Sequence, residues 1–397
     1  MVVLYAASLP MSMAGMEIFG WVTFLLYFLL YFDQDDLFAL KAIKVPILLF
    51  GLFAVHTFIS AAVNSAGQFQ EFLRIFGESR FLLLFLLWVL VHRRFGKGLS
   101  PLLLKAIAAF SLVGGLYAVL QTYTGYKFPE FLPSERTINF GERSLYRGSG
   151  FFQTPLTFAH AYGLIFAFYF SLLIRKFSFQ TRGVSWVILA QVLGIIHSFT
   201  RGVWLAIAGT SVVVVSSLGR KALVFTVGGI LFIGILATSV SPVFRGRLAS
   251  IVDFTDFGFL TRLDLWKANI HLAVSNPILG VGLTENHKHL KSAYNDLGIK
   301  QDFISHAHNN ILELLGGSGF LGGILLLTAY GMVALFFWRN RNPFTAAALA
   351  VMLQLFLSGI VEANFFDDEV NHIFHFFLAM GLASFLKPAE SKLRKVK

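Results

Sequence analysis

The sequence predicts an all-α integral membrane protein with about twelve transmembrane helices, arranged as one polytopic membrane domain over residues 1–397. Hydrophobic residues make up 56% of the chain, charged residues only 13%, and the mean hydropathy is +0.71. A soluble protein of this length could not bury so much apolar surface. Apolar runs also alternate with short basic clusters along the chain, as they do in multi-pass membrane proteins.

A helix needs about 20 mostly apolar residues to cross a bilayer. Pro10 interrupts the first of the apolar segments, and the first ten residues lack a basic n-region and a small-residue cleavage site. We therefore expect a spanning segment there rather than a removable signal peptide. The predicted segments are approximately 1–15, 17–32, 45–64, 78–92, 101–124, 150–174, 184–200, 202–219, 221–240, 309–338, 344–361 and 371–387.

Basic residues occupy every second connection, so the positive-inside rule places these connections and both termini in the cytoplasm. Two long connections, about 125–149 and 241–308, are then external, and the second lies between transmembrane helices 9 and 10. Membrane topology explains the net charge of +11 better than nucleic-acid binding does. The basic residues are Lys41, Lys44, Arg93, Arg94, Lys97, Arg175, Lys176, Arg182, Arg220, Lys221, Arg339, Arg341 and the tail 387–397.

The long loop contains one predicted amphipathic helix, at 261–274. Thr261 is the expected cap, and Asn276-Pro277 ends the helix. Such a helix could also simply lie on the bilayer surface. Its apolar stripe at three-to-four spacing consists of Leu263, Trp266, Ile270, Ala273 and Val274.

Three external arginines are candidates for binding phosphate. Arg201 lies between two apolar segments with almost no loop around it, Arg262 opens the loop helix, and Arg147 stands where the first long loop returns to the membrane. A guanidinium binds phosphate oxygens through two parallel hydrogen bonds and stays charged at any relevant pH. The alternatives are a structural ion pair or a snorkelling side chain for Arg201, and a solvated loop arginine for Arg262.

His308 lies at the external entrance to the predicted helix 309–338. The amide donors of a helix N-terminus attract anions, and an imidazole there could act as a general base or orient an acceptor hydroxyl. A histidine that merely satisfies a local hydrogen bond remains the alternative.

Histidines and carboxylates near this helix could instead form a metal site. The pairs His287/His289 and His306/His308 lie near Glu285 and Asp302, but no His-Glu-x-x-His spacing occurs and the chain has no Cys. We therefore predict no metal site. An acidic group in the last external loop could supply a carboxylate to a reaction centre, hold a cation or form a solvated cap; it consists of Glu362, Asp367, Asp368 and Glu369.

This set of fixed arginines and an imidazole, without a nucleophilic triad or a phosphate loop, suits a substrate that already carries a pyrophosphate. His308-Asn309, nine further residues and Gly319-Phe320-Leu321-Gly322 resemble the signature of O-antigen ligases. The run from Phe199 through Arg201 to Trp204 resembles the arginine motif of the O-antigen ligase and polymerase superfamily. The segment from Arg262 and Trp266 to the run 276–282 is similar to the family's loop segment before its histidine.

The resemblance covers most of the chain and implies a GT-C-like fold. It also implies metal-independent, inverting transfer of an O-antigen polysaccharide from undecaprenyl pyrophosphate to lipid A-core, at the periplasmic face of the bacterial inner membrane and without a cofactor. By residue, it implies that Arg201 and Arg262 bind pyrophosphate and take part in catalysis and that His308 activates the acceptor. Further substrate contacts are expected from Arg147, Asn309 and Trp266. We expect a monomer surrounded by membrane lipids, with no nucleic-acid partner.

Two other functions stay open from the sequence. A polymerase that joins lipid-linked repeat units, or a related protein-glycosylating transferase, would share the architecture. A lipid or glycan transporter is the alternative from another class, although the collection of polar residues at one membrane face disfavours transport.

Overall fold

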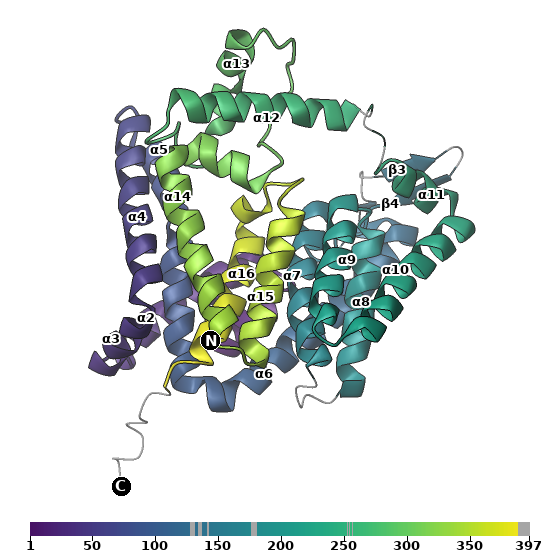
Figure 1. Ribbon diagram of the computed structural model, residues 1–397, viewed down its shortest axis with the longest axis horizontal. Coiled ribbons are helices and arrows are strands. Elements are labelled where there is room, and N and C mark those ends of the chain that lie inside the picture. The colour runs from purple at the N-terminus through teal and green to yellow at the C-terminus, as the bar shows by residue number, and fades with distance from the viewer. Residues whose placement is uncertain are drawn as a thin grey trace.

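The computed structural model describes residues 1–127, 132–133, 137–140, 143–175, 181–251, 253, 255 and 257–387. Lys176 and residues 388–397 of the predicted basic tail lie outside this part of the chain. Two short antiparallel strand pairs interrupt a bundle of α-helices (Figure 1). The helices are α1 Val2–Ser8, α2 Met13–Leu30, α3 Gln34–Leu40, α4 Lys44–Asn64, α5 Phe69–Gly77, α6 Arg80–Thr124, α7 Pro155–Ile174, α8 Thr181–His197, α9 Arg201–Ser216, α10 Arg220–Val240, α11 Pro242–Ala249, α12 Phe257–Ser275, α13 Asn286–Asp296, α14 Asn310–Arg339, α15 Pro343–Ser358 and α16 Asp368–Ala383, with 3-10 turns at Lys41–Ile43 and Asn364–Phe366. The strands are β1 Tyr126–Lys127 with β2 Leu132–Pro133, and β3 Thr137–Phe140 with β4 Arg143–Tyr146.

The helix content confirms the predicted all-α class and a multi-pass membrane protein. Among the described residues, 6 helices are long and apolar enough to cross a membrane, and the number rises to 7 if α5 and the first part of α6, bent by 40°, form one broken span. Each of the predicted segments overlaps a helix. The number of twelve spans stays a prediction.

Three predicted segments differ from the observed helices. The segment 1–15 forms the 7-residue α1 followed by a turn, which is too short to cross a bilayer by itself. The segments 78–92 and 101–124 belong to one 45-residue helix, α6, which continues through Pro101. Proline is tolerated there because neighbouring helices and local adjustment can satisfy the carbonyl that loses its donor.

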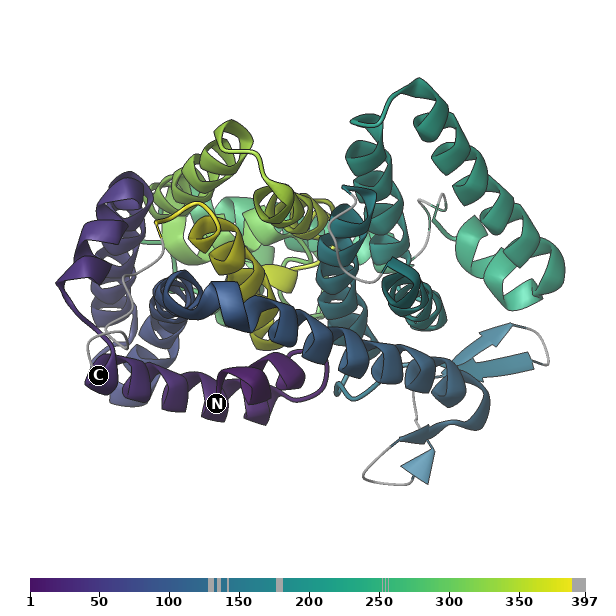
Figure 2. The ribbon, with the colours of Figure 1, turned by 90° about the horizontal axis from the view of Figure 1, so that it is seen from below.

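Helix α7 forms the centre of the bundle and contacts α8, α9, α15 and α16. In its most apolar stretch 83% of the residues are buried, compared with 0% in α10. Figure 2 shows α10 lying apart from the rest of the bundle, and its main contacts are with α9 and α11. The residues at the start of α7 are therefore held rigidly inside the protein.

The long connection between α10 and α14 folds into α11, α12 and α13. Helix α12 lies across one end of the bundle, and α3 lies toward the opposite end (Figure 1). The predicted loop helix is thus present, but it begins at Phe257, so that Thr261 is a buried interior residue rather than the cap.

The predicted apolar stripe of this helix is not the face that the protein itself buries. Ile270 and Val274 are 50% and 62% exposed, whereas Leu265, Ala268 and Leu272 are buried. The buried face packs against Leu290, Ala293 and Tyr294 of α13 and against Val281. The loop thus has a small hydrophobic core of its own, and this core determines which face of α12 is buried. The periodicity of a single helix does not identify that face.

Helix α14 is broken at Gly319, where φ is 66° and ψ is 179°. The loop 276–282 enters this break, with hydrogen bonds from Val281 N to Gly316 O (3.2 Å), Gly282 N to Gly317 O (2.9 Å) and Phe320 N to Pro277 O (2.7 Å). A Cβ atom at residue 319 would lie 2.7 Å from Pro277 O, so glycine is required there. As a result, the first part of α14 runs beneath α12 and carries the residues before it into the same region (Figure 1).

Candidate functional site

Four arginines line one cavity of about 340 Å³ beside α12. They come from four separate segments: Arg147 follows β4, Arg201 begins α9, Arg247 belongs to α11 and Arg262 to α12. Asp253 and Glu362 also line the cavity, so positive groups outnumber negative ones among its described residues. Such a concentration of guanidinium groups in a concave site favours an anion of high charge density.

The turn between α8 and α9 fixes the position of Arg201. Phe199 adopts a φ of 55° and is fully buried, and the Trp204 Nε1–H donates to Ile195 O at 3.0 Å. Arg201 is therefore the first residue of α9, and its Nη1 donates to Ser250 O at 2.6 Å. A non-glycine residue at positive φ is costly and is maintained by its surroundings, which here pack both aromatic rings against α11.

Two of the other arginines hold the same turn. Arg147 donates from Nε to Ser198 O at 2.9 Å and from Nη2 to Thr200 Oγ1 at 3.2 Å. Arg247 donates from Nη2 to Phe199 O at 3.0 Å. These three arginines are thus positioned by backbone carbonyls and a hydroxyl, and they carry their charges to the cavity wall in a fixed geometry.

Arg262 differs from the other three. Its side chain is half-buried in the cavity wall, and it makes no hydrogen bond or ion pair with any residue that the structure describes. Confining a guanidinium there without a partner is unfavourable unless an anion joins it. Arg262 is therefore the arginine best placed to gain from ligand binding.

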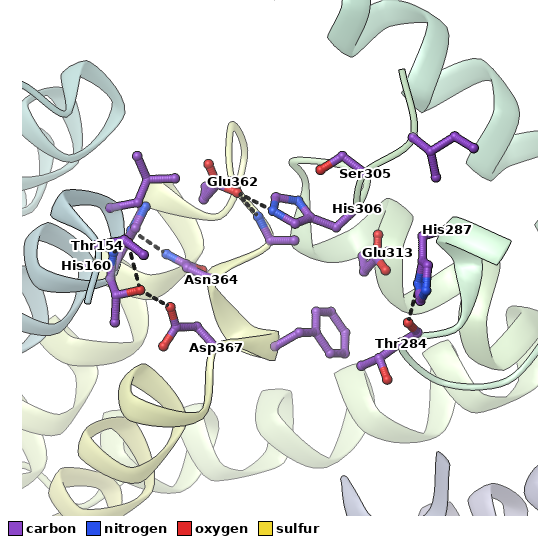
Figure 3. Close-up of a pocket in the computed structure, with 15 residues that line it drawn as sticks. Thr154, His160, Thr284, His287, Ser305, His306, Glu313, Glu362, Asn364 and Asp367 are labelled. Carbon is purple, nitrogen blue, oxygen red and sulfur yellow. Dashed lines mark hydrogen bonds and ion pairs between the residues drawn. The ribbon is translucent and has the colours of Figure 1, made fainter. Parts of the chain in front are cut away.

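A second, larger cavity of about 640 Å³ adjoins the first. Figure 3 shows residues that line this larger cavity. Leu156, His160 and Glu362 line both cavities and so form the boundary between them. The larger cavity contains carboxyl and imidazole groups instead of guanidinium groups; its titratable lining residues are His160, His287, His306, Glu313, Glu362 and Asp367.

Glu362 accepts a hydrogen bond from His308 and lies close to His306. His308 Nδ1 lies 3.0 Å and 3.1 Å from the two carboxylate oxygens, and His306 Nε2 lies 3.3 Å from Oε1. Burial opposes ionisation of Glu362, but the hydrogen bond from His308 and the neighbouring imidazole charges lower its pKa to about 2. Glu362 is therefore an anion at neutral pH.

The hydrogen bonds also determine which nitrogen of each imidazole carries the proton. The His308 backbone N–H donates to His306 Nδ1 at 3.2 Å, so His306 presents Nε2–H to Glu362. His308 presents Nδ1–H to the same carboxylate, which leaves its Nε2 as a lone-pair acceptor. Desolvation by the surrounding protein, more than any nearby charge, lowers the pKa of His306 although 43% of its side chain is exposed, and the positive charge of Arg262 contributes in the same direction.

His308 itself reaches the larger cavity indirectly. It is absent from the residues that line either cavity, and its ring packs against that of His306 with 4.1 Å between the ring centroids. Its φ of 48° lies in the left-handed region, which points to local strain at the start of α14.

The remaining predicted site residues, Asn309 and Trp266, lie beside these cavities rather than in their walls. The Asn309 side chain caps α14, accepting from Ile311 N and Leu312 N, and donates to Ile360 O at 3.0 Å. Trp266 lies one turn along α12 from Arg262, and its buried Nε1–H has no hydrogen-bond partner among the described residues. Their proposed contacts with substrate stay predictions.

Sequence reasoning did not single out Arg247 or His160, and it left Glu362 within an undifferentiated acidic group. Arg247 follows the predicted span 221–240 in the run Arg245-Gly246-Arg247, which reads as an ordinary basic cluster. His160 occupies an apolar helix, where a hydrogen-bonded core histidine is the common case. Only the packing of α7 against the loop 361–367 shows that His160 and Glu362 lie together.

His306, His308 and Glu362 form a group of potential metal ligands, with ligand atoms within 4.8 Å of one another. The hydrogen bond from His308 to Glu362 and the close approach of His306 to the same carboxylate account for these short distances without an ion. Zinc ligation would require His308 Nδ1 to lose its proton and the hydrogen bond to Glu362. The prediction of a metal-independent site stays open to test.

These features define a multi-pass membrane protein with an arginine-lined cavity and a histidine–carboxylate cavity at one end of the bundle. Residues 184–327, which extend from α8 into α14 and include Arg201, Arg262 and His308, match the O-antigen ligase family model. This match confirms the resemblance predicted from the motifs in this part of the chain. It supports a glycosyltransferase of the O-antigen ligase or polymerase type in general. None of the curated proteins matches the chain.

Proposed function

We propose that the protein transfers an O-antigen polysaccharide from undecaprenyl pyrophosphate to lipid A-core. The arginine-lined cavity next to the histidine–carboxylate cavity carries this proposal. A pyrophosphate needs several fixed cations, whereas a sugar acceptor needs a base and neutral hydrogen-bonding groups. The two adjoining cavities supply these two environments from one set of converging loops.

In the proposed reaction, Arg147, Arg201 and Arg262 bind the pyrophosphate. An acceptor hydroxyl of lipid A-core approaches from the larger cavity, past His306 in its wall, and gives its proton to Nε2 of His308, while Glu362 stabilises the resulting imidazolium through Nδ1–H. The acceptor oxygen bonds to the anomeric carbon as the bond from that carbon to the pyrophosphate oxygen breaks. The electron pair leaves with the pyrophosphate, whose added negative charge the arginines neutralise. Attack opposite the leaving group inverts the anomeric centre.

The proposed orientation places this site in the periplasm, with both termini in the cytoplasm of a bacterial inner membrane. The basic clusters at Lys41 and Lys44 adjoin α3, toward the end of the bundle opposite α12. A monomer suffices for the proposed reaction, because one chain supplies all the groups named above. The leaving pyrophosphate provides the driving force, so the reaction needs no metal and no cofactor.

Deletion of the gene in its own host tests the proposal. Long polymer accumulating on the carrier lipid beside bare lipid A-core would support the ligase. A core that bears single repeat units would indicate a polymerase instead. For purified protein in vesicles, glycosidic-bond formation between the lipid-linked donor and lipid A-core is expected. Movement of the donor across the vesicle bilayer without bond formation would indicate a transporter and contradict the proposal.

A further inference from the structure

His160 lies at the junction of the two cavities. It belongs to the second turn of α7, only 4% of its surface is exposed, and together with Leu156 and Glu362 it lines both cavities. Figure 3 shows its ring on the same side of the larger cavity as Asn364 and Asp367. A ligand that extends from one cavity into the other therefore passes this imidazole.

A chain of hydrogen bonds determines the tautomer of His160. The Phe365 backbone N–H donates to Asn310 Oδ1 at 2.9 Å, which identifies the other end of that amide as its NH2 group. Asn310 Nδ2 then donates to Asn364 Oδ1 at 2.7 Å.

The Asn364 amide is thereby oriented as well. Its Nδ2 donates to Ser358 Oγ at 2.7 Å and to His160 Nδ1 at 2.8 Å. Because Nδ1 of His160 accepts a hydrogen bond, the neutral imidazole carries its proton on Nε2. This series of hydrogen bonds begins at the Phe365 backbone N–H, which can only donate. The tautomer of His160 therefore does not depend on how the Asn side-chain amides are oriented in the structure.

The Nε2–H of His160 has no hydrogen-bond partner among the described residues. The side-chain polar groups of Asn310, Asn364 and Ser358, which form the hydrogen-bonded series leading to His160, all have partners. A buried donor without a partner is unfavourable, and native proteins rarely retain one without a reason. Since the ring lines a space large enough for a sugar, a bound ligand is the natural source of the missing acceptor.

We infer that His160 Nε2–H donates a hydrogen bond to an oxygen of the glycan donor where its first sugar joins the pyrophosphate. This inference rests on the proposed function. The acceptor oxygen belongs either to that sugar or to the pyrophosphate, and both offer lone pairs at the junction. A neutral donor beside the Glu362 anion can bind such an oxygen without forming a competing ion pair with the carboxylate.

Substitution of His160 tests the inference in a transfer assay with the full-length protein in vesicles. His160→Phe keeps the ring shape but removes the donor, and we expect it to lower kcat/KM by about 100-fold. His160→Gln places an amide donor near the position of Nε2 and should recover part of that loss. His92→Phe is the matched control, because His92 is also 4% exposed with both ring nitrogens unpartnered, but lines neither cavity. Normal transfer by His160→Phe, or an equal loss in His92→Phe, would overturn the inference.

A spectroscopic measurement covers the case in which His160→Phe does not fold. Nitrogen NMR of the wild-type protein with labelled histidine should show His160 as the Nε2–H tautomer, assigned by its loss in H160Q. A shift of this signal with undecaprenyl pyrophosphate identifies a phosphate oxygen as the acceptor, and a shift only with the sugar-bearing donor identifies a sugar oxygen. An Nδ1–H tautomer, or no shift with either lipid, contradicts the inference. Absence of transfer by the wild-type protein would instead count against the proposed function.

Discussion

A Cβ atom added at Gly202 would lie 2.5 Å from Cγ2 of Val361. Gly202 follows Arg201 at the start of α9, and Val361 precedes Glu362 in the loop after α15. This close approach joins the turn that carries the arginine to the loop that carries the carboxylate. The glycine of the Phe-Thr-Arg-Gly-Val-Trp run thus has a packing role that determines how closely the two cavities adjoin.

Gly202→Ala is therefore expected to reduce transfer, because the added methyl group must displace Val361 and with it Glu362. We expect a loss of about 10-fold in kcat/KM, since small displacements of reacting groups are costly. Gly228→Ala in α10 is the control, because a Cβ atom there meets nothing within 4 Å. Equal activity of both variants, measured with lipid-linked donor, would show that the contact with Val361 does not position the site.

Arg262→Ala should abolish donor binding with little effect on thermal stability. Arg262 has no partner among the described residues, so its removal breaks no hydrogen bond that the structure describes. Transfer should fall by at least about 100-fold, as for loss of one preorganised charge in other active sites. Inhibition by inorganic pyrophosphate should weaken in parallel.

The control for this variant is Arg245→Ala. Arg245 is exposed and donates to Thr238 O at 3.1 Å without lining the cavity. If both variants lower transfer equally, the loss reflects the general surface charge rather than the cavity. A lower Tm for Arg262→Ala by several degrees would indicate a structural role instead.

Some residues of this site could be predicted from the sequence, and others could not. Arg201 and Arg262 could be predicted because charges at loopless helix junctions and in external loops have few structural explanations. Their convergence could not be predicted, because it depends on α12 crossing the end of the bundle and on α14 breaking at Gly319. The face of α12 that the protein buries could not be predicted either, because its partner residues lie in α13, which periodicity within one helix does not identify.

Glu362 and His160 illustrate a second limit. An acidic residue in a short external loop and a histidine in an apolar helix are both common in proteins without a catalytic site. Their significance arises from hydrogen bonds across large sequence separations, such as those from His308 to Glu362 and from Asn364 to His160. One sequence carries no signal for such pairs.

Transfer is expected to survive chelation of divalent ions. The hydrogen bond from His308 to Glu362 and the contact of His306 with that carboxylate account for the short distances in this group, and in the proposed reaction the arginines supply positive charge to the leaving pyrophosphate. Purified protein treated with EDTA should retain its rate within about twofold, because no step of the proposed reaction uses a Lewis acid. Complete loss of transfer, followed by restoration with one divalent ion, would instead establish the His306, His308 and Glu362 group as a metal site.

The folded state should lose stability as the pH falls, and Glu362 should be a main cause. Its pKa is about 2 in the protein against 4.5 for an ordinary glutamate, so the unfolded chain takes up the proton first. The resulting stabilisation, roughly 3 kcal/mol, is complete above pH 4.5 and disappears as the pH falls toward 2. His306 acts in the same direction, because its lowered pKa means that the unfolded chain binds a proton below pH 6.5 before the folded protein does.

Thermal unfolding in detergent measures this dependence. Glu362 and His306 should leave the Tm of the wild-type protein nearly constant above pH 6.5. At lower pH their protonation should lower the Tm progressively. Glu362→Gln should be less stable at pH 7 and should lose less between pH 5 and pH 3, because glutamine does not titrate. Glu71→Gln is the control, since the Glu71 carboxylate pairs with Arg74 and Lys288 at the surface, where such pairs contribute little. If the Tm of Glu362→Gln falls between pH 5 and pH 3 as much as that of the wild-type protein, the Glu362 carboxylate is not the group whose protonation destabilises the fold.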